Sequence, residues 1–343
     1  MAGWSATEFP SIPDVDTEPF DVKGALLSRS DSGSIFWDKS APRSYFRGSV
    51  YQGGGRLVSE SQRHGGTGAD LVLTVNPPHI TPEERELALE NHRDGTWLYA
   101  GNWMHGFGHF IVETIPMIWP IVERGPEIQG ISAHRFTSRR TFDWQHDFLR
   151  RVLGERPVEV VDVEPVSYER LIVGARPYRY QRSISSRARI AWEAVAESMP
   201  GSGEGSALKV FLSRTSFVES QPENSWASSR AYGNSRAIDD VFKDHGFTVV
   251  FPEQLSIEEQ VVIARDAHYL AGAGGSALHL AAFSRGARVI EVGDKRSGDR
   301  LVSSQRAIAA VKHQQIAQIP FVESGDGELD VDHAHRELKV LGV

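Results

Sequence analysis

The chain has 343 residues, more than a single compact core usually organises, so we expect two domains of ordinary size. Hydrophobic residues make up 40% and charged residues 24% of the chain, which is typical of globular proteins and excludes wholesale disorder. The absence of cysteine excludes disulfides and thiolate metal sites, and the formal net charge of −8 argues against a dedicated nucleic-acid binder.

The first part of the chain, residues 1–66, is rich in Gly, Ser, Pro and Arg, which predicts an irregular N-terminal arm or cap. Short strand-like pieces interrupt it at Ser34–Trp37 and Ser49–Gln52. The first twenty residues are polar, acidic and proline-rich and show no secretory signal, and no apolar run reaches membrane-spanning length. We therefore expect a soluble, cytoplasmic protein, with a peripheral membrane contact and the oligomeric state left open.

Between residues 67 and 200, apolar runs alternate with segments of helical spacing, which predicts an α/β domain. The strands are expected at Leu71–Val75, Thr96–Ala100, Ile131–Thr137, Val158–Val163 and Arg170–Val173. The helices are expected at Asn102–Glu123, Phe142–Leu153 and Ser185–Met199. Pro200–Ser206, with the sequence PGSGEGS, has no apolar side chain to bury and is the best candidate for a flexible linker.

The same alternation between residues 207 and 325 predicts a second α/β domain, and a C-terminal helix in residues 326–343 is expected to pack back across the joint. The strands are expected at Lys209–Ser213, Phe247–Phe251 and Gln315–Ile319, with two more inside His268–Gly293. The helices are expected at Ser235–His245, Ile257–Asp266, Gln305–Lys312 and Asp332–Leu341. This pattern implies two Rossmann-like, doubly wound parallel sheets that face a cleft.

The segment His268–Gly293 predicts a strand, a glycine turn, a helix over Ser276–Arg285 and a second strand that ends at Glu291. Glycines allow the backbone to approach a phosphate closely, and the first amides of the helix would bind it. The candidate phosphate-binding residues are Gly272, Gly274, Gly275 and Ser276. The same spacing fits a dinucleotide fingerprint with Glu291 on the ribose, so a nicotinamide or flavin enzyme is an alternative, as is a plain tight turn.

The segment Phe247–Gln260, FTVVFPEQLSIEEQ, contains a helix cap and a loop carboxylate. Ser256 and Glu259 fit an S-x-x-E capping box, which explains both without a ligand. Glu253 comes before the cap, at the carboxyl end of a strand, where open α/β sheets bind ligands. It is a candidate contact to a base or ribose, and a solvated carboxylate is the alternative.

Two arginines of the second half could neutralise a leaving nucleoside diphosphate. Arg214 follows directly on the strand in LKVFLSR, and Arg236 comes before a helix after a polar loop. A guanidinium group binds phosphate oxygens bidentately and stabilises the charge that develops on a leaving group. Surface arginines are common, and Arg214 is the better candidate because of its place at a strand end.

The segment Gly101–Trp119, GNWMHGFGHFIVETIPMIW, contains a histidine and a carboxylate four residues apart. His109 and Glu113 would share one face of a helix, an arrangement suited to a general base that deprotonates an acceptor hydroxyl. Asn102 and His105 come before this helix, and we expect them near the acceptor. A metal is disfavoured because no H-E-x-x-H pattern is present, and a core histidine bonded to its own helix is the alternative interpretation.

In their order along the chain, these motifs resemble glycosyltransferase family 61, including its bacterial capsular-polysaccharide-type members. The resemblance extends from about Gly101 to Gly293. Its motifs are His109–Pro116, Ser213–Arg214, Arg236–Ile238, Pro252–Gln260 and the glycine turn followed by Glu291. The chain departs from the family pattern at Gly106, at Asp239–Asp240 and at Gly274, where the family usually has a histidine.

The resemblance implies a GT-B architecture, with the acceptor on the N-terminal domain and a nucleotide sugar, a UDP-sugar as the first expectation, on the C-terminal one. It implies an inverting, metal-independent hexosyl- or pentosyltransferase that uses no cofactor. His109 or Glu113 would be the base, and Glu113 could instead orient His109. Arg214 and the amides of Gly274–Ser276 would bind the diphosphate, Glu253 would lie near the nucleoside, and Arg236 near donor or acceptor. A non-catalytic module that binds a nucleotide sugar or glycan is a further alternative.

Overall fold

The computed structural model describes residues 3–13, 18–30, 48–63, 76–136, 141–201, 209–222, 232–295, 297–325 and 328–343. The chain divides into two compact units. The N-terminal unit is Pro10–Ala194, and the C-terminal unit combines Met1–Phe9 with Val195–Val343. Helix α5 (Arg187–Ser198) crosses the boundary between them. Among the described residues, no helix combines the length and apolar character needed to span a membrane.

The N-terminal unit is built on a six-stranded sheet in the order β3-β2-β7-β4-β5-β6. These strands are β2 (Phe20–Leu27), β3 (Val50–Tyr51), β4 (His92–Trp103), β5 (Gly130–Arg135), β6 (Val158–Val161) and β7 (Val166–Val173). Strands β7, β4, β5 and β6 are parallel to one another, whereas β2 is antiparallel to both β7 and β3. The predicted α/β class with a parallel core is therefore confirmed for this unit.

Strand β2 differs from the irregular arm predicted for residues 1–66, because the described segment Phe20–Leu27 is a regular strand. It pairs with β7 over most of its length, from Phe20 opposite Val173 to Leu27 opposite Val166. Its alternation of apolar and polar residues is interrupted at Gly24, which has a φ of +57°, so the period-two pattern of a strand was hidden in the sequence. The predicted strand pieces at Ser34–Trp37 and Leu71–Val75 lie outside the described residues.

A segment of changing helical type follows β4 and packs against it. It consists of α2 (Phe107–His109), the π-helical turn η3 (Phe110–Thr114), the 3₁₀ turn η4 (Ile115–Ile118), α3 (Trp119–Arg124) and the 3₁₀ turn η5 (Gly125–Glu127). Pro116 and Pro120 have no amide hydrogen to continue an α-helical ladder, which accounts for the changes of type. The predicted regular helix Asn102–Glu123 is thus wrong at its start, because Asn102 and Trp103 belong to β4.

The remaining elements of this unit are α1 (Pro82–Glu90), α4 (Asp143–Leu153), the 3₁₀ turn η2 (Ser59–Ser61) and a small hairpin of β8 (Tyr178–Arg179) and β9 (Ser183–Ile184). The predicted helices Phe142–Leu153 and Ser185–Met199 correspond to α4 and α5. Helix α1 packs against β2 and β7, where Ala88 joins a small core cluster with Leu26, Tyr51 and Ile80. A second cluster contains Trp97, Tyr99 and Tyr168 of the central strands.

The C-terminal unit contains a six-stranded sheet in the order β1-β14-β13-β12-β10-β11. Its strands are β1 (Ser5–Ala6), β10 (Lys209–Leu212), β11 (Thr248–Val250), β12 (Tyr269–Ala273), β13 (Arg288–Val292) and β14 (Gln315–Ile319). All neighbours are parallel except β1, which pairs antiparallel with β14. The strands follow the flavodoxin-like order 2-1-3-4-5, whose topological switch point lies between β10 and β12.

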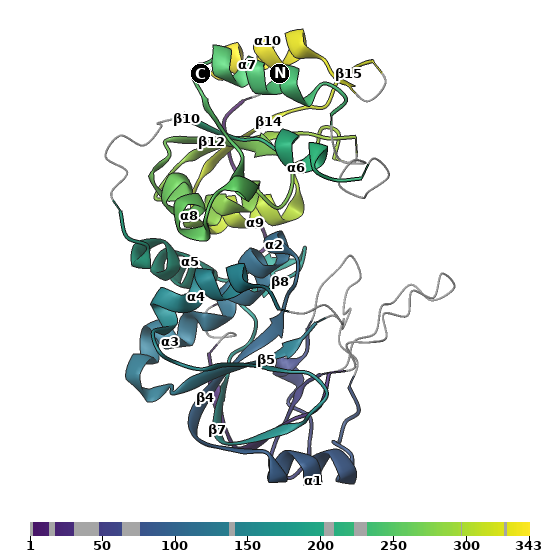
Figure 1. The fold of residues 1–343 in the computed structure, drawn as a ribbon, viewed down its shortest axis with the longest axis vertical. Coiled ribbons are helices and arrows are strands. Elements are labelled where there is room, and N and C mark those ends of the chain that lie inside the picture. The colour runs from purple at the N-terminus through teal and green to yellow at the C-terminus, as the bar shows by residue number, and fades with distance from the viewer. Residues whose placement is uncertain are drawn as a thin grey trace. The chain divides into compact units, whose positions relative to one another are not determined.

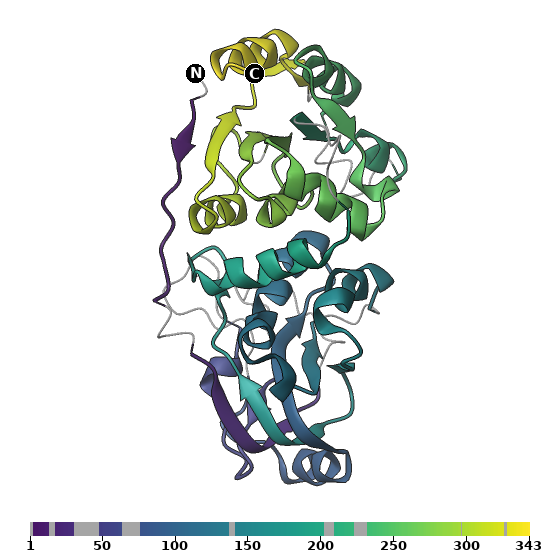
Figure 2. The ribbon, with the colours of Figure 1, turned by 90° about the vertical axis from the view of Figure 1, so that its left-hand side faces the viewer.

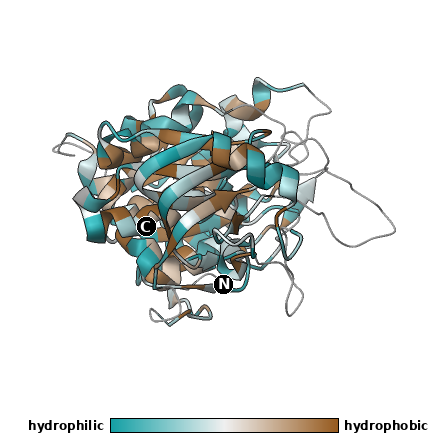
Figure 3. Cartoon of the chain, turned by 90° about the horizontal axis from the view of Figure 1, so that it is seen from below, coloured by the Kyte–Doolittle hydropathy of each residue, from teal (hydrophilic) through white to brown (hydrophobic). Residues whose placement is uncertain are grey.

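Helices cover both faces of this sheet, with α7 and α10 on one face and α8 and α9 on the other (Figures 1 and 2). The helical elements are α6 (Thr215–Glu219), α7 (Ser235–Asp244), η7 (Pro252–Gln254), α8 (Ile257–Asp266), η8 (Leu278–Phe283), α9 (Ser303–Val311) and α10 (Val331–Val340). A short hairpin of β15 (Glu323–Gly325) and β16 (Glu328–Leu329) comes before α10. Hydrophobic and hydrophilic residues are interspersed along the helices (Figure 3), as expected where a helix has one buried face.

Of the predicted linker Pro200–Ser206, Pro200 and Gly201 are among the described residues, and the rest of this prediction stays untested. The expected elements of the second half are present with end shifts of a few residues. One is of a different kind: the predicted α-helix Ser276–Arg285 is the short 3₁₀ helix η8.

Candidate active site

The carboxyl ends of β4 and β7 bring two polar residues together. The register places Tyr99 opposite Val173, and Asn102 and Arg176 each come three residues later. Arg176 Nη2 donates a hydrogen bond of 2.8 Å to Asn102 Oδ1. Gly101 has a φ of +70°, and a Cβ there would lie 2.8 Å from Arg176 Nη1, so glycine is required beside this guanidinium group.

Thr114 ties the helical segment to the end of β4. Its Oγ1 donates to the Asn102 carbonyl at 2.9 Å and accepts from the Met104 amide at 3.1 Å. Residues 107–113 are thereby held at the same sheet edge as Asn102. His105 is half-buried in the loop that joins β4 to α2.

The predicted pair of His109 and Glu113 is present at this edge. His109 Nδ1 and Glu113 Oε1 lie 2.6 Å apart. The Glu113 side chain is only 3% exposed, whereas that of His109 is 43% exposed. The pair therefore joins a buried carboxylate to an imidazole that reaches the surface.

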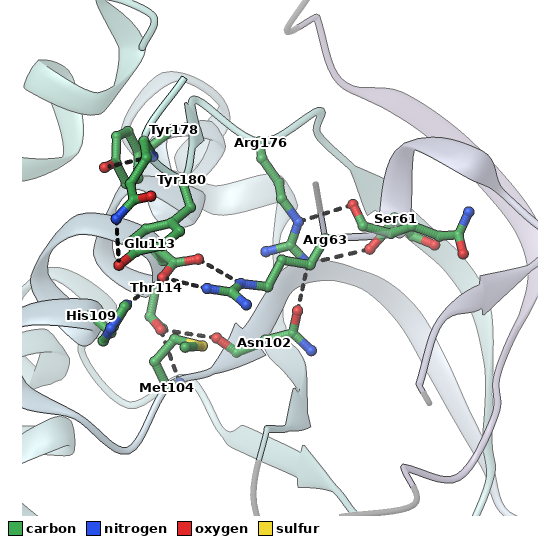
Figure 4. A network of polar contacts seen from close by, with 12 residues as sticks. Ser61, Arg63, Asn102, Met104, His109, Glu113, Thr114, Arg176, Tyr178 and Tyr180 are labelled. Atoms are coloured by element: carbon green, nitrogen blue, oxygen red, sulfur yellow. Dashed lines mark hydrogen bonds and ion pairs between the residues drawn. The ribbon is translucent and has the colours of Figure 1, made fainter. Parts of the chain in front are cut away.

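Arg63 completes this arrangement and was not foreseen from the sequence. Its Nε lies 2.6 Å from Glu113 Oε2 and its Nη2 lies 2.8 Å from Oε1, so the two groups form a buried bidentate pair (Figure 4). Fifty residues separate the partners, and Arg63 lies in the glycine-rich first part of the chain, which carries no local signal for such a contact.

Opposing effects set the protonation of Glu113. Burial alone would raise its pKa, but the charge of Arg63 and the hydrogen bonds from His109 and Arg63 together hold that pKa well below its ordinary value. Glu113 is therefore a carboxylate at neutral pH, and it accepts a hydrogen bond from the His109 Nδ1–H. This contact assigns the tautomer of His109 whose Nε2 can accept a proton.

Aromatic contacts fix the imidazole further. The rings of His109 and Tyr180 have centroids 5.1 Å apart at an angle of 43°. The Arg63 guanidinium lies 5.5 Å from the centroid of the Tyr180 ring and 4.7 Å from that of Phe136. Within the described parts of the chain, no group of three or more His, Asp or Glu side chains is arranged to hold a metal ion.

In the C-terminal unit, Arg214 and the glycine turn meet at the switch point between β10 and β12. A Cβ built on Gly275, whose φ is +142°, would lie 3.8 Å from Arg214 Nη1. In the portion of the chain that is described, the amides of Gly275, Ser276 and Ala277 donate to no backbone carbonyl. A guanidinium group and amides without a backbone acceptor thus lie together at the place where α/β sheets of this strand order bind ligands.

The other two glycines of the turn serve packing. A Cβ on Gly272 would approach the Leu212 carbonyl oxygen to 3.2 Å, and one on Gly274 would approach both Glu291 Oε1 and Val302 Cγ2 to 3.1 Å. Gly274 is buried, whereas Ser276 is exposed. Because η8 has only six residues, the dipole of a full α-helix is not available at this turn. The groups that can bind an anion here are therefore the backbone amides themselves.

Glu291 lies beneath the turn and not at its surface. It is fully buried, and its Oε1 accepts a 2.8 Å hydrogen bond from the Val302 amide. Burial raises its pKa to about 7, with a smaller contribution from Asp294 and an opposing one from the Val302 amide. The interpretation in which Glu291 holds the ribose of a dinucleotide is therefore wrong for this conformation.

Glu253 and Arg236 each contact a residue of α6, the short helix that follows β10. Glu253 Oε1 accepts a 2.6 Å hydrogen bond from Ser216, which is two residues after Arg214. Arg236 is largely exposed and forms a bidentate pair with Glu219 at 2.8 Å. A hollow beside them is lined by Thr215, Ser216, Glu219, Arg236, Asp239, Asp240, Lys243 and Phe251. The predicted capping box of Ser256 and Glu259 is present at α8.

Comparisons with known proteins agree with part of this picture. The family model described as Glycosyltransferase 61 matches residues 107–290, more than half of the chain. No curated protein sequence matches the chain.

Two solved structures resemble it weakly. One is the bacterial iron-containing dodecameric glycosyltransferase TibC from enterotoxigenic E. coli H10407, with 11% identity, coverage of 96% of this chain and 88% of that chain, and a TM-score of 0.34. The other is the dodecameric iron-containing heptosyltransferase TibC in complex with ADP-D-beta-D-heptose, with 10% identity, the same coverages and a TM-score of 0.33. At such low TM-scores these similarities carry no argument about this chain.

Proposed function

Because the chain belongs to the glycosyltransferase 61 family, we propose that it moves a sugar from a nucleotide-sugar donor to a hydroxyl of a glycan or glycoconjugate acceptor. The observation that supports this mechanism best is the contact chain from Arg63 through Glu113 to His109. It supplies an oriented base with a surface-facing imidazole, which a transfer to a hydroxyl requires.

His109 is the base in this proposal, and Glu113 orients it. Both oxygens of Glu113 are engaged and its pKa is held low, so it is a poor proton acceptor. His109 Nε2 takes the acceptor hydroxyl proton while the hydroxyl oxygen bonds to the anomeric carbon. The bond from that carbon to the diphosphate oxygen breaks in the same displacement, so the configuration inverts. Glu113 then stabilises the imidazolium ion.

Arg214 and the amides of Gly275 and Ser276 would bind the departing diphosphate. A guanidinium group and fixed amides neutralise the negative charge that develops on it, which makes a metal-independent reaction the natural expectation. Glu253, through its contact with Ser216, would lie near the nucleoside, and Arg236 beside it. Gly272 and Gly274 would contribute by letting the turn pack closely.

We propose that the two units divide the work as in a GT-B enzyme. The N-terminal unit, with Asn102 and His105 beside the pair of His109 and Glu113, would bind the acceptor. The C-terminal unit would bind the donor, with a UDP-sugar as the first expectation. The expected limits 67–200 and 207–325 are replaced in this proposal by those of the two compact units, Pro10–Ala194 and Val195–Val343 with Met1–Phe9. The chemistry would use no cofactor.

Isothermal titration calorimetry with UDP, GDP, ADP, CMP and NAD⁺ tests the donor side. We expect one nucleoside phosphate to bind, and Arg214→Gln to weaken it at least tenfold, because a charge-assisted contact to phosphate is lost. Arg285→Gln is the matched control, since Arg285 is an exposed arginine of the same unit that pairs with Asp266. Binding of NAD⁺ alone, or equal binding by Arg214→Gln, would contradict the donor assignment.

A further inference from the structure

Beside the proposed base lies a segment with an unusual charge pattern. From Arg170 to Trp192 the chain contains six arginines and neither Asp nor Glu, although its overall net charge is −8. Arg176, Arg179 and Arg182 recur at every third residue, with Tyr178 and Tyr180 between them. Positive charge is thus concentrated in one short stretch of an acidic protein. Solubility of the surface alone does not require such a concentration.

Among the residues that the structure describes, no carboxylate forms a hydrogen bond or ion pair with these three arginines. Arg176 is only 6% exposed, and it donates to the Ser61 carbonyl, the Gln62 carbonyl and Asn102 Oδ1, which are all neutral acceptors. In the described regions, Arg179 and Arg182 form no ion pair with a carboxylate. Arg176 is therefore a buried guanidinium group whose described hydrogen-bond acceptors include no carboxylate, an arrangement that is costly and calls for an explanation other than stability.

The side-chain amide of Asn102 contacts Arg176 and has an unpaired hydrogen-bond donor among the described residues. Asn102 is 2% exposed, and its Nδ2 has no hydrogen-bond partner among the residues described. The Asn102 Oδ1 is held by Arg176, so the amide presents its unspent donor beside the guanidinium group. A guanidinium group that contacts no described carboxylate and an unpaired N–H donor are both complementary to an oxyanion.

The segment reaches His109 through Tyr180. Tyr180 packs on the imidazole with ring centroids 5.1 Å apart, and it belongs to the turn between β8 and β9. Gln181 holds that turn in the left-handed region, with a φ of 59°, while its amide donates to the Tyr178 hydroxyl at 3.1 Å. Strain of this kind persists where the surrounding structure requires it, and it concentrates at functional sites.

We infer that residues 176–182 form the acceptor-binding surface, and that the acceptor carries a carboxylate or phosphate group which the arginines recognise while Tyr180 presents a flat apolar face beside His109. The inference rests on the proposed transferase function and adds the charge class of the acceptor.

The test uses the whole chain and three probe sugars: glucuronic acid, glucose 6-phosphate and glucose. Binding is measured by calorimetry at low ionic strength for the natural chain, for Arg179→Gln/Arg182→Gln and for Arg150→Gln/Arg151→Gln. The last pair removes two exposed arginines from α4 of the same unit and so matches the change in net charge. We expect at least one charged sugar to bind, glucose not to bind, and salt to weaken the binding.

The double substitution at Arg179 and Arg182 should weaken that binding at least tenfold, while the α4 control stays unchanged. Preference between glucuronic acid and glucose 6-phosphate would tell whether a carboxylate or a phosphate is recognised. Equal binding by both double variants, or equal binding of glucose, would overturn the inference. So would an effect confined to vesicles of phosphatidylcholine and phosphatidylglycerol, which would make the segment a membrane contact.

None of the probe sugars needs to be turned over for this test. A failure here would leave the proposed transfer reaction standing, because His109 and Glu113 do not depend on the charge of the acceptor. Conversely, binding of the charged sugars without any sugar transfer would support the acceptor-binding surface and contradict the proposed reaction.

Discussion

The residue that organises the N-terminal site is Glu113, which is buried between a guanidinium group and an imidazole. Its spacing from His109 could be predicted, because residues four apart share a helix face. The partner that fixes its charge could not, since Arg63 is fifty residues away. The sequence left either His109 or Glu113 as the base. The pairing with Arg63 favours His109, because a carboxylate held by two partners is a weak proton acceptor.

Replacing Glu113 by Gln should damage both stability and turnover. The substitution leaves the buried charge of Arg63 uncompensated, which we expect to cost about 3–5 kcal/mol of unfolding free energy. Turnover should fall by about 10²- to 10⁴-fold, the usual weight of acid–base catalysis, because the orientation of His109 is lost. Urea unfolding and steady-state kinetics measure the two effects.

Glu193→Gln is the control for this substitution. Glu193 forms an exposed i,i+4 contact with Arg189 on α5, where a pair is worth little. Equal stability of the Glu113 and Glu193 variants would contradict the buried pair.

Glu291 predicts a pH dependence of stability. Its pKa is raised from 4.5 to about 7 in the folded chain, so the folded state binds a proton more tightly than the unfolded state does. Stability therefore falls as pH rises from about 4.5 to about 7, by an amount on the order of 3 kcal/mol. Glu291→Gln should remove this fall, so the variant gains on the natural chain between pH 5 and pH 8. Parallel pH profiles of the melting temperature would refute the buried assignment.

At the scale of elements, the turn between β12 and η8 shows which glycines serve packing and which can face a ligand. The sequence predicted a phosphate-binding turn but could not sort its glycines, because their neighbours come from distant elements. Gly272 meets β10, and Gly274 meets Glu291 and Val302, while Gly275 faces Arg214. The departure from the family histidine at Gly274 has a steric reason here, since no side chain fits there without displacement.

Gly274→Ala tests this packing. The added Cβ would lie 3.1 Å from both Glu291 Oε1 and Val302 Cγ2, so we expect a loss of about 1–3 kcal/mol in unfolding free energy, as in other overpacked cores. Gly3→Ala is the control in the same unit, because nothing lies within 4 Å of a Cβ at Gly3. A Gly274 variant as stable as the Gly3 variant would show that the turn adapts freely.

At the scale of the whole molecule, the α/β class and the parallel cores of both sheets could be predicted from the alternation of strand and helix patterns. Strand β2 could not, because Gly24 breaks its periodicity and its partner β7 lies about 140 residues further on. The short 3₁₀ helix η8 was mistaken for an α-helix, since a run of apolar residues does not distinguish the two. Local sequence patterns predict the helices and strands, whereas contacts between distant segments determine which polar side chains lie together.

The most direct test of the account is sugar transfer by the natural chain and by His109→Ala, measured as nucleoside diphosphate release from a panel of nucleotide sugars with acidic and neutral sugar acceptors. The account predicts release that depends on an acceptor in the natural chain and a fall of at least about 100-fold in His109→Ala, with the fold retained. Undiminished transfer by His109→Ala would contradict the assignment of the base. No release from any donor by the natural chain would contradict the proposed reaction itself.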